Sequence, residues 1–369
     1  MTLESAYKDK TVFVTGHTGF KGSWLCEWLL MLGAKVVGYA TEPPSTPSHF
    51  EALGLSGRIH KDERADVRDY GTLYSSLKEA QPDYVFHLAA QPLVRQSFAD
   101  PVETVQTNVN GTLNVLEALR QLNRACTVVC ITTDKVYRNE EWLYAYREHD
   151  PLGGFDPYSA SKACADILTN SYQQSFFAAS AAGKTPINVA TARGGNVIGG
   201  GDWAADRIVP DCMRALAKGE TIQVRNRHAT RPWQHVLELL SGYLLLAATT
   251  QRASDEHDVK RVAELCTPYN FGPQLDSNRS VKALVETILE AWPGNWQDFS
   301  EENPPHEAGK LNLTIDKAYH SLGWAPRWNF AETISQTVAW YRRYYESDHS
   351  PEEVQVLTRS QIERYLVAT

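Results

Sequence analysis

The chain has 369 residues, of which 43% are hydrophobic and 22% charged, a composition typical of a soluble globular protein large enough for two lobes. Its net charge of -8 argues against a nucleic-acid or acidic-membrane partner, so an anionic ligand would need a local cluster of basic side chains. No segment has the apolar pattern of a membrane span or a secretion signal, and the 6 cysteines and 11 histidines show no metal-ligand spacing. We therefore expect a cytoplasmic protein with reduced thiols and no metal site.

The chain opens with the pattern of a dinucleotide-binding unit. Residues 10–15 (KTVFVT) predict a buried strand, and apolar side chains at helical spacing lead on to a stop at Gly33. Between them lies the turn Gly16-His17-Thr18-Gly19-Phe20-Lys21-Gly22. Glycines at this spacing let the backbone approach a pyrophosphate, and the helix start offers free N–H groups. We expect the turn to bind a dinucleotide; a purely structural turn is the alternative.

The end of the second predicted strand, residues 35–40, is where the acid that selects NAD usually stands. Here the chain continues with Thr41 and Glu42, so the usual Asp is missing, and no Arg stands there to receive a 2′-phosphate. The missing Arg and the nearby Glu42 favour NAD over NADP. After a weak third strand, Asp66 is a candidate for contacting the adenine amino group, with Val67 beside it.

The fourth predicted strand, residues 83–88, ends at Leu88 and leads directly into Ala89 and Ala90. Small side chains at a strand's carboxyl end leave room for a cofactor, although tight packing would select them too. Residues 107–112 are expected to cap a helix that runs to about Asn123. Within that cap, Asn108 either braces the backbone of the site or is a plain turn residue.

The fifth predicted strand, residues 127–132, delivers Thr133, Asp134 and Lys135 to the sheet edge where parallel sheets bind ligands. A charged and aromatic connection then leads to Tyr158 and Lys162, which share one helix face if Pro157 starts the helix. An ammonium beside a phenol lowers the phenol's pKa, which would make Tyr158 a base for an alcohol proton while hydride leaves the same carbon. Thr133 can hydrogen-bond the same alcohol. The alternative is an ordinary amphipathic helix, because this spacing is common by chance.

The second half of the chain begins after a sixth strand at residues 187–192. A glycine-rich stretch from Arg193 to Gly201 marks the predicted domain change. We place a dinucleotide-binding domain at 1–193 and a mainly substrate-binding domain at 194–369, with residues of about 233–270 returning to the first. Residues 223–236 gather Arg225, Arg227, Arg231 and His235, side chains suited to phosphate oxygens, although a solvated loop would look similar.

Taken together, these motifs resemble the extended short-chain dehydrogenases/reductases that act on nucleotide-sugars, over nearly the whole chain. Within that family, GHTGFKGSWL, AAQPLVRQS, TTDKVY, GGGDWAADRIVPD and RPWQHVLE are similar to segments of 4,6-dehydratases of CDP-linked sugars. The resemblance implies an α/β fold: a Rossmann-type doubly wound parallel sheet with a smaller α/β substrate-binding lobe. It also implies a tightly associated NAD, a homo-oligomer built through long helices, and a place in making 3,6-dideoxy sugars for bacterial O-antigens.

The chemistry implied by the resemblance has three steps: oxidation of the sugar at C4, loss of water across C5 and C6, and return of the hydride to C6. In related dTDP-glucose dehydratases an Asp-Glu pair follows the Thr, whereas this chain has Asp134 and Lys135. That departure also fits the enzymes of CDP-linked sugars. Our hypothesis makes Asp134 the acid to O6 and Lys135 the base at C5, which requires a neutral Lys135. A surface Asp-Lys pair is the alternative.

Residue type and resemblance together give three sets of site residues. The catalytic set is Thr133, Asp134, Lys135, Tyr158 and Lys162. The cofactor set adds Gly16 to Gly22, Asp66, Val67, Leu88, Ala89, Ala90, Asn108, Thr132 and Arg193 to Tyr158 and Lys162. The substrate set is Gln91, Arg95, Asn196, Arg207, Arg225, Arg231 and His235.

Two other functions are consistent with parts of the sequence. A 4-epimerase or reductase of the same family would explain Tyr158 and Lys162, but it needs neither Asp134 nor Lys135. A non-catalytic NAD-sensing regulator would need neither the Tyr/Lys pair nor the arginines.

Overall fold

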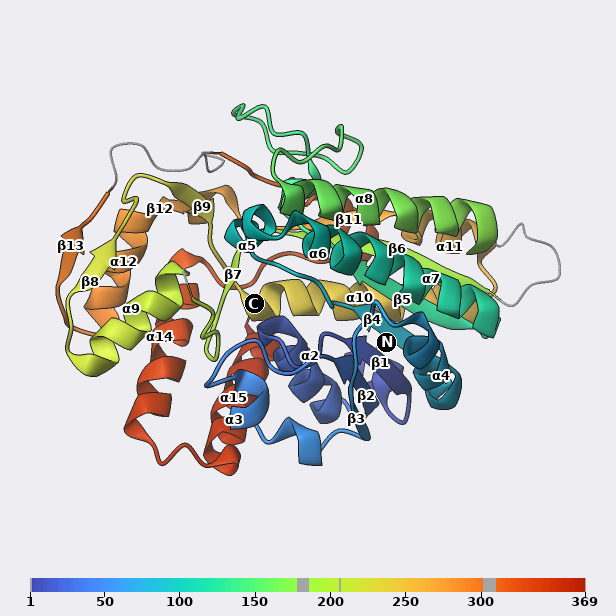
Figure 1. Ribbon diagram of the computed structural model, residues 1–369, viewed down its shortest axis with the longest axis horizontal. Coiled ribbons are helices and arrows are strands. Elements are labelled where there is room, and N and C mark those ends of the chain that lie inside the picture. The colour runs from blue at the N-terminus through green and yellow to red at the C-terminus, as the bar shows by residue number, and fades with distance from the viewer. Residues whose placement is uncertain (1, 178–185, 206, 301–309, 369) are drawn as a thin grey trace.

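The computed structural model describes residues 2–177, 186–205, 207–300 and 310–368. Its centre is a parallel seven-stranded sheet in the order β11-β6-β5-β4-β1-β2-β3 (Figure 1). The strands are β1 (Thr11–Thr15), β2 (Lys35–Ala40), β3 (Lys61–Arg64), β4 (Tyr84–His87), β5 (Cys126–Ile131), β6 (Ile187–Gly194) and β11 (Pro268–Phe271). The strand order reverses between β1 and β4, which makes the sheet doubly wound and creates a crevice at that point.

Helices cover both faces of the sheet, because alternate side chains of each strand point to opposite faces. Val12 and Val14 of β1 join the core under α2 (Phe20–Met31) and α10 (Val236–Asp255). Phe13, between them, joins the core under α4 (Tyr70–Ala80), α7 (Gly111–Leu122) and α8 (Pro157–Tyr172). Apart from the edge strand β3, which is charged and only half-buried, the sheet is buried on both sides, which is why strands such as β1 and β5 are rich in apolar residues on both faces.

The remaining elements build the second lobe and the edges. The other helices are α1 (Leu3–Tyr7), α3 (His49–Ala52), α5 (Val94–Ala99), α6 (Pro101–Val105), α9 (Ile208–Lys218), α11 (Val259–Leu265), α12 (Val281–Ala291), α13 (Asp316–Leu322), α14 (Phe330–Glu346) and α15 (Pro351–Val367). In the part of the chain that the structure describes, three two-stranded sheets pair β7 (Val197–Ile198) with β10 (Gln234–His235), β8 (Ile222–Val224) with β13 (Trp296–Asp298), and β9 (Thr230–Pro232) with β12 (Asn278–Ser280). Among the described residues, none of the helices combines the length and the apolar character that crossing a membrane requires.

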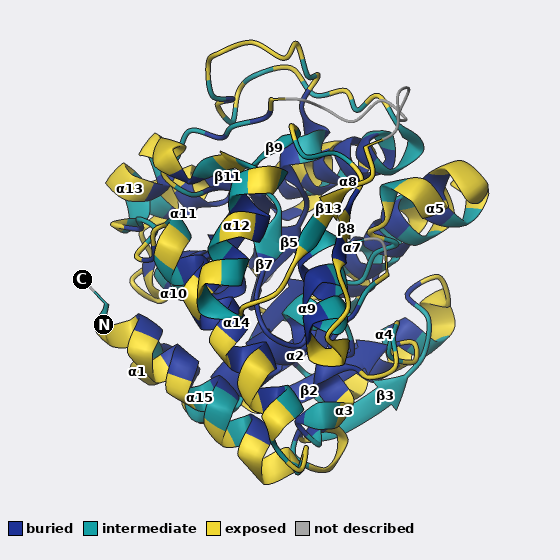
Figure 2. Ribbon diagram, turned by 90° about the vertical axis from the view of Figure 1, so that its left-hand side faces the viewer, coloured by how far each residue is buried: buried dark blue, intermediate teal, exposed yellow. Residues whose placement is uncertain are grey.

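The last helix of the chain returns to the first helix of the dinucleotide unit. Helix α2 is buried on nearly all sides, and α15 packs on it with an exposed outer face (Figure 2). Glu27 of α2 is fully buried, and it accepts hydrogen bonds from Arg58 at 2.6 and 2.7 Å and from Arg359 of α15 at 2.6 Å. A buried carboxylate needs such partners, so these two arginines allow a charged residue inside the α2–α15 contact.

One predicted element differs in the structure. Residues 107–112 do not cap a helix, because the helix has already begun at Pro101, capped by Asp100. The chain passes from α6 through a π-helical turn at Gln106–Asn110 directly into α7, which ends at Leu122. Local polar residues predict a cap, but the upstream Asp-Pro pair is the stronger start signal.

Candidate active site

A cavity of about 1790 Å³ opens at the carboxyl ends of the parallel strands. Its walls come from the segments that follow β1, β2, β3, β4, β5 and β6. The second lobe adds residues 201–205, 207–211, 225–226 and 229–233, and Gln223. This is where an open α/β sheet binds ligands, at the reversal of strand order.

The glycine-rich turn forms the floor of the cavity beside α2. Gly16 has φ +74°, and a Cβ there would lie 2.7 Å from the Ala89 nitrogen. A Cβ on Gly22 would lie 2.1 Å from the Gly16 oxygen. The α2 N-cap is Gly19, so no side chain caps the first amides of the helix, and they remain available to a ligand.

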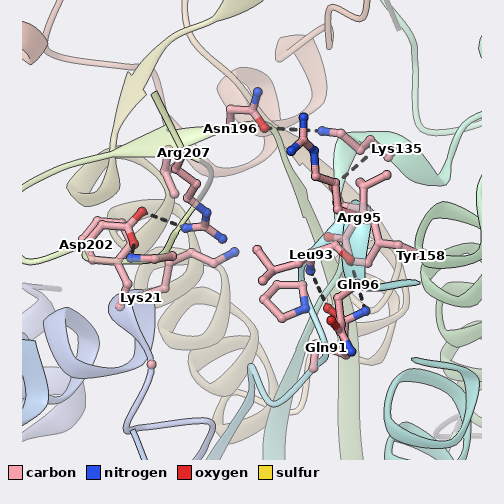
Figure 3. A pocket seen from close by; sticks show the side chains of 18 of the residues that line it. Lys21, Gln91, Leu93, Arg95, Gln96, Lys135, Tyr158, Asn196, Asp202 and Arg207 are labelled. Carbon is pink, nitrogen blue, oxygen red and sulfur yellow. Dashed lines mark hydrogen bonds and ion pairs between the residues drawn. The ribbon is translucent and has the colours of Figure 1, made fainter. Parts of the chain in front are cut away.

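Two cations extend into the cavity from the wall formed by this turn and the second lobe. Figure 3 shows Lys21 and Arg207 pointing toward the opposite wall, which carries Tyr158 and Lys135. Arg207 donates to Asp202 at 2.7 Å. Burial and the nearby charges of Lys162 and Arg207 lower the pKa of Lys21 to about 7. The middle of the cavity is therefore rich in positive charge, which suits a ligand with phosphates.

Tyr158 and Lys162 lie on one face of α8, as expected from Pro157 at the helix start and Asp156 as the N-cap. The expected lowering of the Tyr158 pKa is wrong. Burial raises the pKa of Tyr158 to about 12, partly opposed by the Thr133 hydroxyl. Lys162 is buried, donates to the Ile131 carbonyl at 2.8 Å, and has its own pKa lowered to about 8 by desolvation. Desolvation by burial, which disfavours the charged phenolate, therefore decides the direction of the Tyr158 shift.

Thr133, Asp134 and Lys135 stand at the end of β5 and all line the cavity. Asp134 is 2% exposed and accepts hydrogen bonds from the Thr133 hydroxyl at 2.9 Å and from the Lys135 ammonium at 3.1 Å. Lys135 also donates to Asn196 at 3.3 Å. The proposed acid and base thus touch each other directly, and Asn196 steadies the base from the neighbouring strand end.

At the far end of the cavity, Asp66 and Val67 line the wall, with Leu88, Ala89 and Ala90 closer to the glycine-rich turn. Asp66 is held by Arg68 at 2.6 Å. Glu42 also lines this end and accepts from Arg64 at 2.9 Å. Arg64 was not predicted at this end, because it arrives from β3 rather than from the end of β2. Its guanidinium is bound to Glu42 and Asp62 and does not line the cavity.

Two predicted cofactor residues lie behind the cavity wall. His17 is fully buried, with its Nε2 2.7 Å from the Asp62 carboxylate. Asn108 is also buried and bonds the Gln91 backbone at 2.8 and 3.1 Å and the Ser161 hydroxyl at 2.9 Å. Asn108 therefore braces the backbone of the site, one of its two predicted roles, while direct cofactor contact by either residue is wrong for this geometry.

Two further predictions fail because the side chains turn into the core. Arg193 is 2% exposed and forms a bidentate pair with Asp166. His235 is fully buried between Trp24 and Trp328, and its Nδ1 accepts from the Leu237 amide at 3.3 Å. Neither residue lines the cavity, so His235 does not reach a ribose and Arg193 does not contact the cofactor directly.

The other predicted substrate residues do line the cavity: Gln91, Arg95, Asn196, Arg207, Arg225 and Arg231. Asp202, which holds Arg207, was not predicted. Its only signal in the sequence is its place in a glycine-rich run five residues before Arg207.

Comparisons with known proteins agree with this geometry. The family model described as GDP-mannose 4,6 dehydratase matches residues 13–337. The CDP-glucose 4,6-dehydratase of Salmonella typhimurium is 42% identical over 100% of this chain and 99% of that protein. A dTDP-glucose 4,6-dehydratase of Streptomyces antibioticus is 29% identical, over 90% of this chain and 92% of that protein.

Solved structures share the fold. The dTDP-glucose 4,6-dehydratase of Bacillus anthracis in complex with NAD superposes with a TM-score of 0.73 at 20% identity, covering 91% of this chain and 98% of that one. The UDP-glucose 4-epimerase of Thermotoga maritima with UDP-glucose also gives 0.73, at 19% identity, with 90% and 98% covered. These two likenesses carry the fold alone, whereas the full-length match and the family model carry the family. The chain belongs to the GDP-mannose 4,6 dehydratase family, within the extended short-chain dehydrogenases/reductases.

Proposed function

We propose that the protein is a CDP-D-glucose 4,6-dehydratase that converts CDP-D-glucose into CDP-4-keto-6-deoxy-D-glucose with NAD as resident cofactor. The observation that carries this proposal is the contact between Asp134 and Lys135 in the same cavity as Tyr158. A 4-epimerase needs the tyrosine but has no use for an added acid and base. The relative of the same length and 42% identity supports the choice of CDP-glucose.

The residues of the glycine-rich turn fit an NAD pyrophosphate. The closeness of the Gly16 and Gly22 backbones leaves no space for side chains, and the uncapped start of α2 offers amide donors. The small side chains of Ala89 and Ala90, which also line the cavity, leave space for the cofactor beside this turn. When bound there, NAD supplies the acceptor for the C4 hydrogen and later its donor to C6.

In the first step, Tyr158 takes the proton of the C4 hydroxyl, and the Thr133 hydroxyl orients that oxygen. Burial raises the pKa of Tyr158 to about 12, so the phenol has to lose its proton before it can act as the base. The Lys162 ammonium, four residues along α8, would favour the phenolate, as would the positive charge of a bound NAD+.

In the second step, Lys135 removes the proton from C5 and Asp134 protonates the departing O6, so that water leaves. Both roles require the neutral forms of the two side chains. Because they lie 3.1 Å apart, transfer of one proton from the ammonium to the carboxylate creates both neutral forms at once.

The diphosphate of the substrate lies along the arginines of the second lobe. Arg207 faces the reacting centre, and Arg225 and Arg231 line the outer part of the cavity. Asn196 and Gln91 contribute amides, and Arg95 approaches from the opposite wall (Figure 3). Planar guanidinium groups grip phosphate oxygens in pairs, which gives orientation as well as affinity.

The test is incubation of the purified protein with CDP-glucose in D2O with catalytic NAD and no reductant. Loss of one water with deuterium at C5 supports the proposal. An unchanged mass with inversion at C4 identifies an epimerase. Turnover of a dTDP- or GDP-sugar but not of CDP-glucose would refute the assignment of the CDP nucleotide. A protein that binds NAD and transforms none of these sugars would be a regulator.

The proposal includes two domains: residues 1–193 bind NAD, and residues 194–369 mainly bind the nucleotide-sugar. Residues of about 233–270 return to the NAD-binding domain. The position of β11 beside β6 and of α10 under the sheet supports that return. It also includes the cytoplasm as the location, where reducing conditions keep the free cysteines as thiols.

We further infer a homodimer through α6 and α8, which lie side by side (Figure 1). Val102 and Ile167 on these helices are 63% and 56% exposed, and neighbouring Phe98 is 61% exposed. Large apolar side chains exposed on neighbouring helices are typical of a subunit contact. Ile167→Glu should shift the protein to a monomer in sedimentation; an unchanged mass would place the contact elsewhere.

A further inference from the structure

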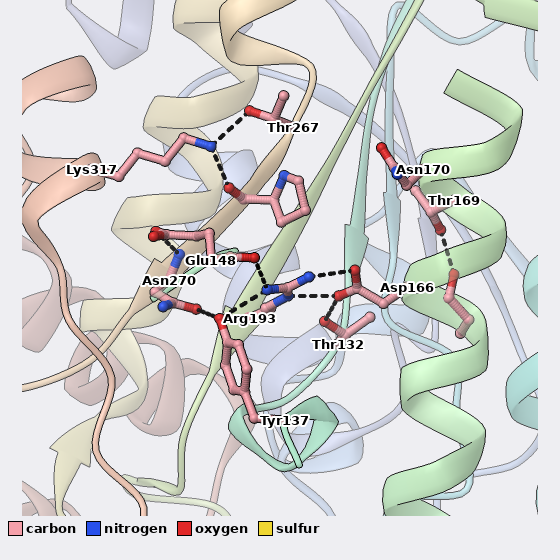
Figure 4. A network of polar contacts seen from close by, with 12 residues as sticks. Thr132, Tyr137, Glu148, Asp166, Thr169, Asn170, Arg193, Thr267, Asn270 and Lys317 are labelled. Carbon is pink, nitrogen blue, oxygen red and sulfur yellow. Dashed lines mark hydrogen bonds and ion pairs between the residues drawn. The ribbon is translucent and has the colours of Figure 1, made fainter. Parts of the chain in front are cut away.

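Behind the proposed acid and base lies a buried network centred on Arg193, at the end of β6 (Figure 4). Its guanidinium donates to both carboxylate oxygens of Asp166, at 2.8 and 2.7 Å. It also donates to the Tyr137 hydroxyl at 2.8 Å and to the Glu148 carbonyl at 2.9 Å. Arg193 and Asp166 are each at most 2% exposed, so these bonds form without competition from water.

The network holds both ends of the segment that carries the acid and the base. At its start, the Thr132 hydroxyl donates to Asp166 at 3.1 Å. At its end, Tyr137 accepts from Arg193 and donates to Asn270 at 2.7 Å. Thr133, Asp134 and Lys135 lie between these two anchors, so their position depends on the buried pair.

The same pair fixes the helix that carries Tyr158 and Lys162. Asp166 follows Lys162 by four residues on α8, which places both on one helix face. Arg193 therefore links β5, β6 and α8 at one point. Lys162 has a second and independent anchor, its bond to the Ile131 carbonyl at 2.8 Å.

The network also ties down the connection between β5 and α8, whose residues 138–141 and 153–156 line the cavity. Glu148 supplies its carbonyl to Arg193, and its carboxylate accepts from the Asn270 amide at 2.9 Å. The Asn270 side chain in turn donates to the Tyr146 carbonyl at 3.0 Å. The wall next to the acid and base is thus held from the same centre.

We propose that Arg193 is a positioning residue that sets Asp134 and Lys135 relative to the sugar, so that elimination depends on it more strongly than C4 oxidation does. This inference rests on the proposed function. Oxidation uses Tyr158 and Lys162, and the latter keeps its bond to Ile131 when the network is weakened. Elimination uses Asp134 and Lys135, which lie between Thr132 and Tyr137. Thr132 is hydrogen-bonded to Asp166 and Tyr137 to Arg193, so both ends of this segment are held by the same ion pair.

The decisive variant is Tyr137→Phe, which removes the hydroxyl that joins Arg193 to Asn270 and keeps the ring. Tyr146→Phe is the matched control: its ring stacks on Tyr137 at 5.1 Å, but its hydroxyl bonds Asn139 and the Glu140 amide instead. Arg193→Lys is the second variant, since lysine keeps the charge but cannot bind Asp166 and Tyr137 in the same fork.

Two rates are measured in single turnover with CDP-glucose in D2O: formation of reduced nicotinamide, and entry of deuterium at C5. For Tyr137→Phe we expect deuterium entry to fall about tenfold and reduction to change by less than about twofold, since small misplacements of reacting groups are costly. Arg193→Lys should lower deuterium entry by about a hundredfold. Tyr146→Phe should keep the wild-type ratio of the two rates.

Equal changes in both rates, or no change in either variant, would overturn the positioning role and leave Arg193 as a purely structural residue. Melting temperatures of the variants are measured as well. A variant that is less stable but keeps the wild-type ratio of deuterium entry to nicotinamide reduction also contradicts the positioning role. Failure of the wild-type protein to release water from CDP-glucose would instead refute the proposed function, independently of the variants.

Discussion

The two ends of the substrate cavity hold their charges in different ways. At the reaction end, Asp134 and Lys162 are 2% and 5% exposed and are held by hydrogen bonds to β5 and its following turn. At the outer end, where the phosphates are proposed to bind, the Arg225 side chain is 49% exposed, and Arg207, nearer the middle of the cavity, is 36% exposed. Burial shifts the pKa values of groups that transfer protons, such as Tyr158 and Lys162. Exposed arginines stay charged and attract the phosphates of the substrate. We therefore expect substitutions at the first end to lower kcat and those at the second to raise KM.

The largest effect is expected at Tyr158. Tyr158→Phe keeps the ring and removes the only proposed acceptor for the C4 hydroxyl proton, so kcat should fall about 10³-fold with KM nearly unchanged. Initial rates of ketosugar formation measure this. Tyr172→Phe, at the other end of α8, is the control for loss of a hydroxyl on that helix. A loss below about tenfold would mean that another group takes the proton.

The next effect separates elimination from oxidation. Lys135→Met should lower the rate of water loss about 10²-fold and suppress deuterium entry at C5, while reduction of the nicotinamide persists. Lys218→Met on α9, outside the cavity lining, controls for loss of a lysine. Intact C5 exchange in Lys135→Met would refute the base assignment and move it to another residue.

At the phosphate end, Arg207→Ala should raise KM more than Arg225→Ala. Arg207 neutralises Asp202, whose side chain is 6% exposed, so its loss leaves a buried carboxylate beside the substrate phosphates. We expect KM to rise about 10²-fold for Arg207→Ala and about threefold to tenfold for Arg225→Ala and Arg231→Ala, with kcat little changed. Steady-state kinetics decide this. An unchanged KM for Arg231→Ala would remove that residue from the substrate site.

The smallest expected effect is the pH dependence of the free energy of unfolding that comes from three buried histidines. Burial lowers the pKa of His49, His87 and His235 to about 3 each, below the ordinary value of 6.5. Because the unfolded chain binds these protons first, stability is fully present above pH 6.5 and falls as the pH drops toward 3. From pH 7 to pH 6 each histidine should lower the free energy of unfolding by about 0.7 kcal/mol.

Urea unfolding at both pH values measures this loss. His235→Phe removes one of the three contributions, so the pH-dependent part of the free energy attributable to them should shrink by about a third, whatever the variant's absolute stability. An unchanged difference between pH 7 and pH 6 would show that His235 gains no protons on unfolding in this range.

The sequence by itself determined the features that depend on local chain geometry. The strand-turn-helix unit with Gly16 to Gly22, the spacing of Tyr158 and Lys162 on one helix face, and the delivery of Thr133, Asp134 and Lys135 by β5 all follow from residues close in the chain. Helical and strand periodicity, proline at a helix start and glycine in a tight turn act over a few residues, so the printed order of amino acids is enough to read them.

Only the tertiary structure decided which way the polar side chains of the core turn. Arg193 and His235 have the residue types of ligand-binding side chains and stand next to segments that line the cavity, yet both turn inward. Arg193 can do so because Asp166, 27 residues earlier on α8, supplies the opposite charge there, and His235 can because Trp24 and Trp328 enclose it. The cost of burying such groups is set by partners distant in the sequence, which no local pattern reveals.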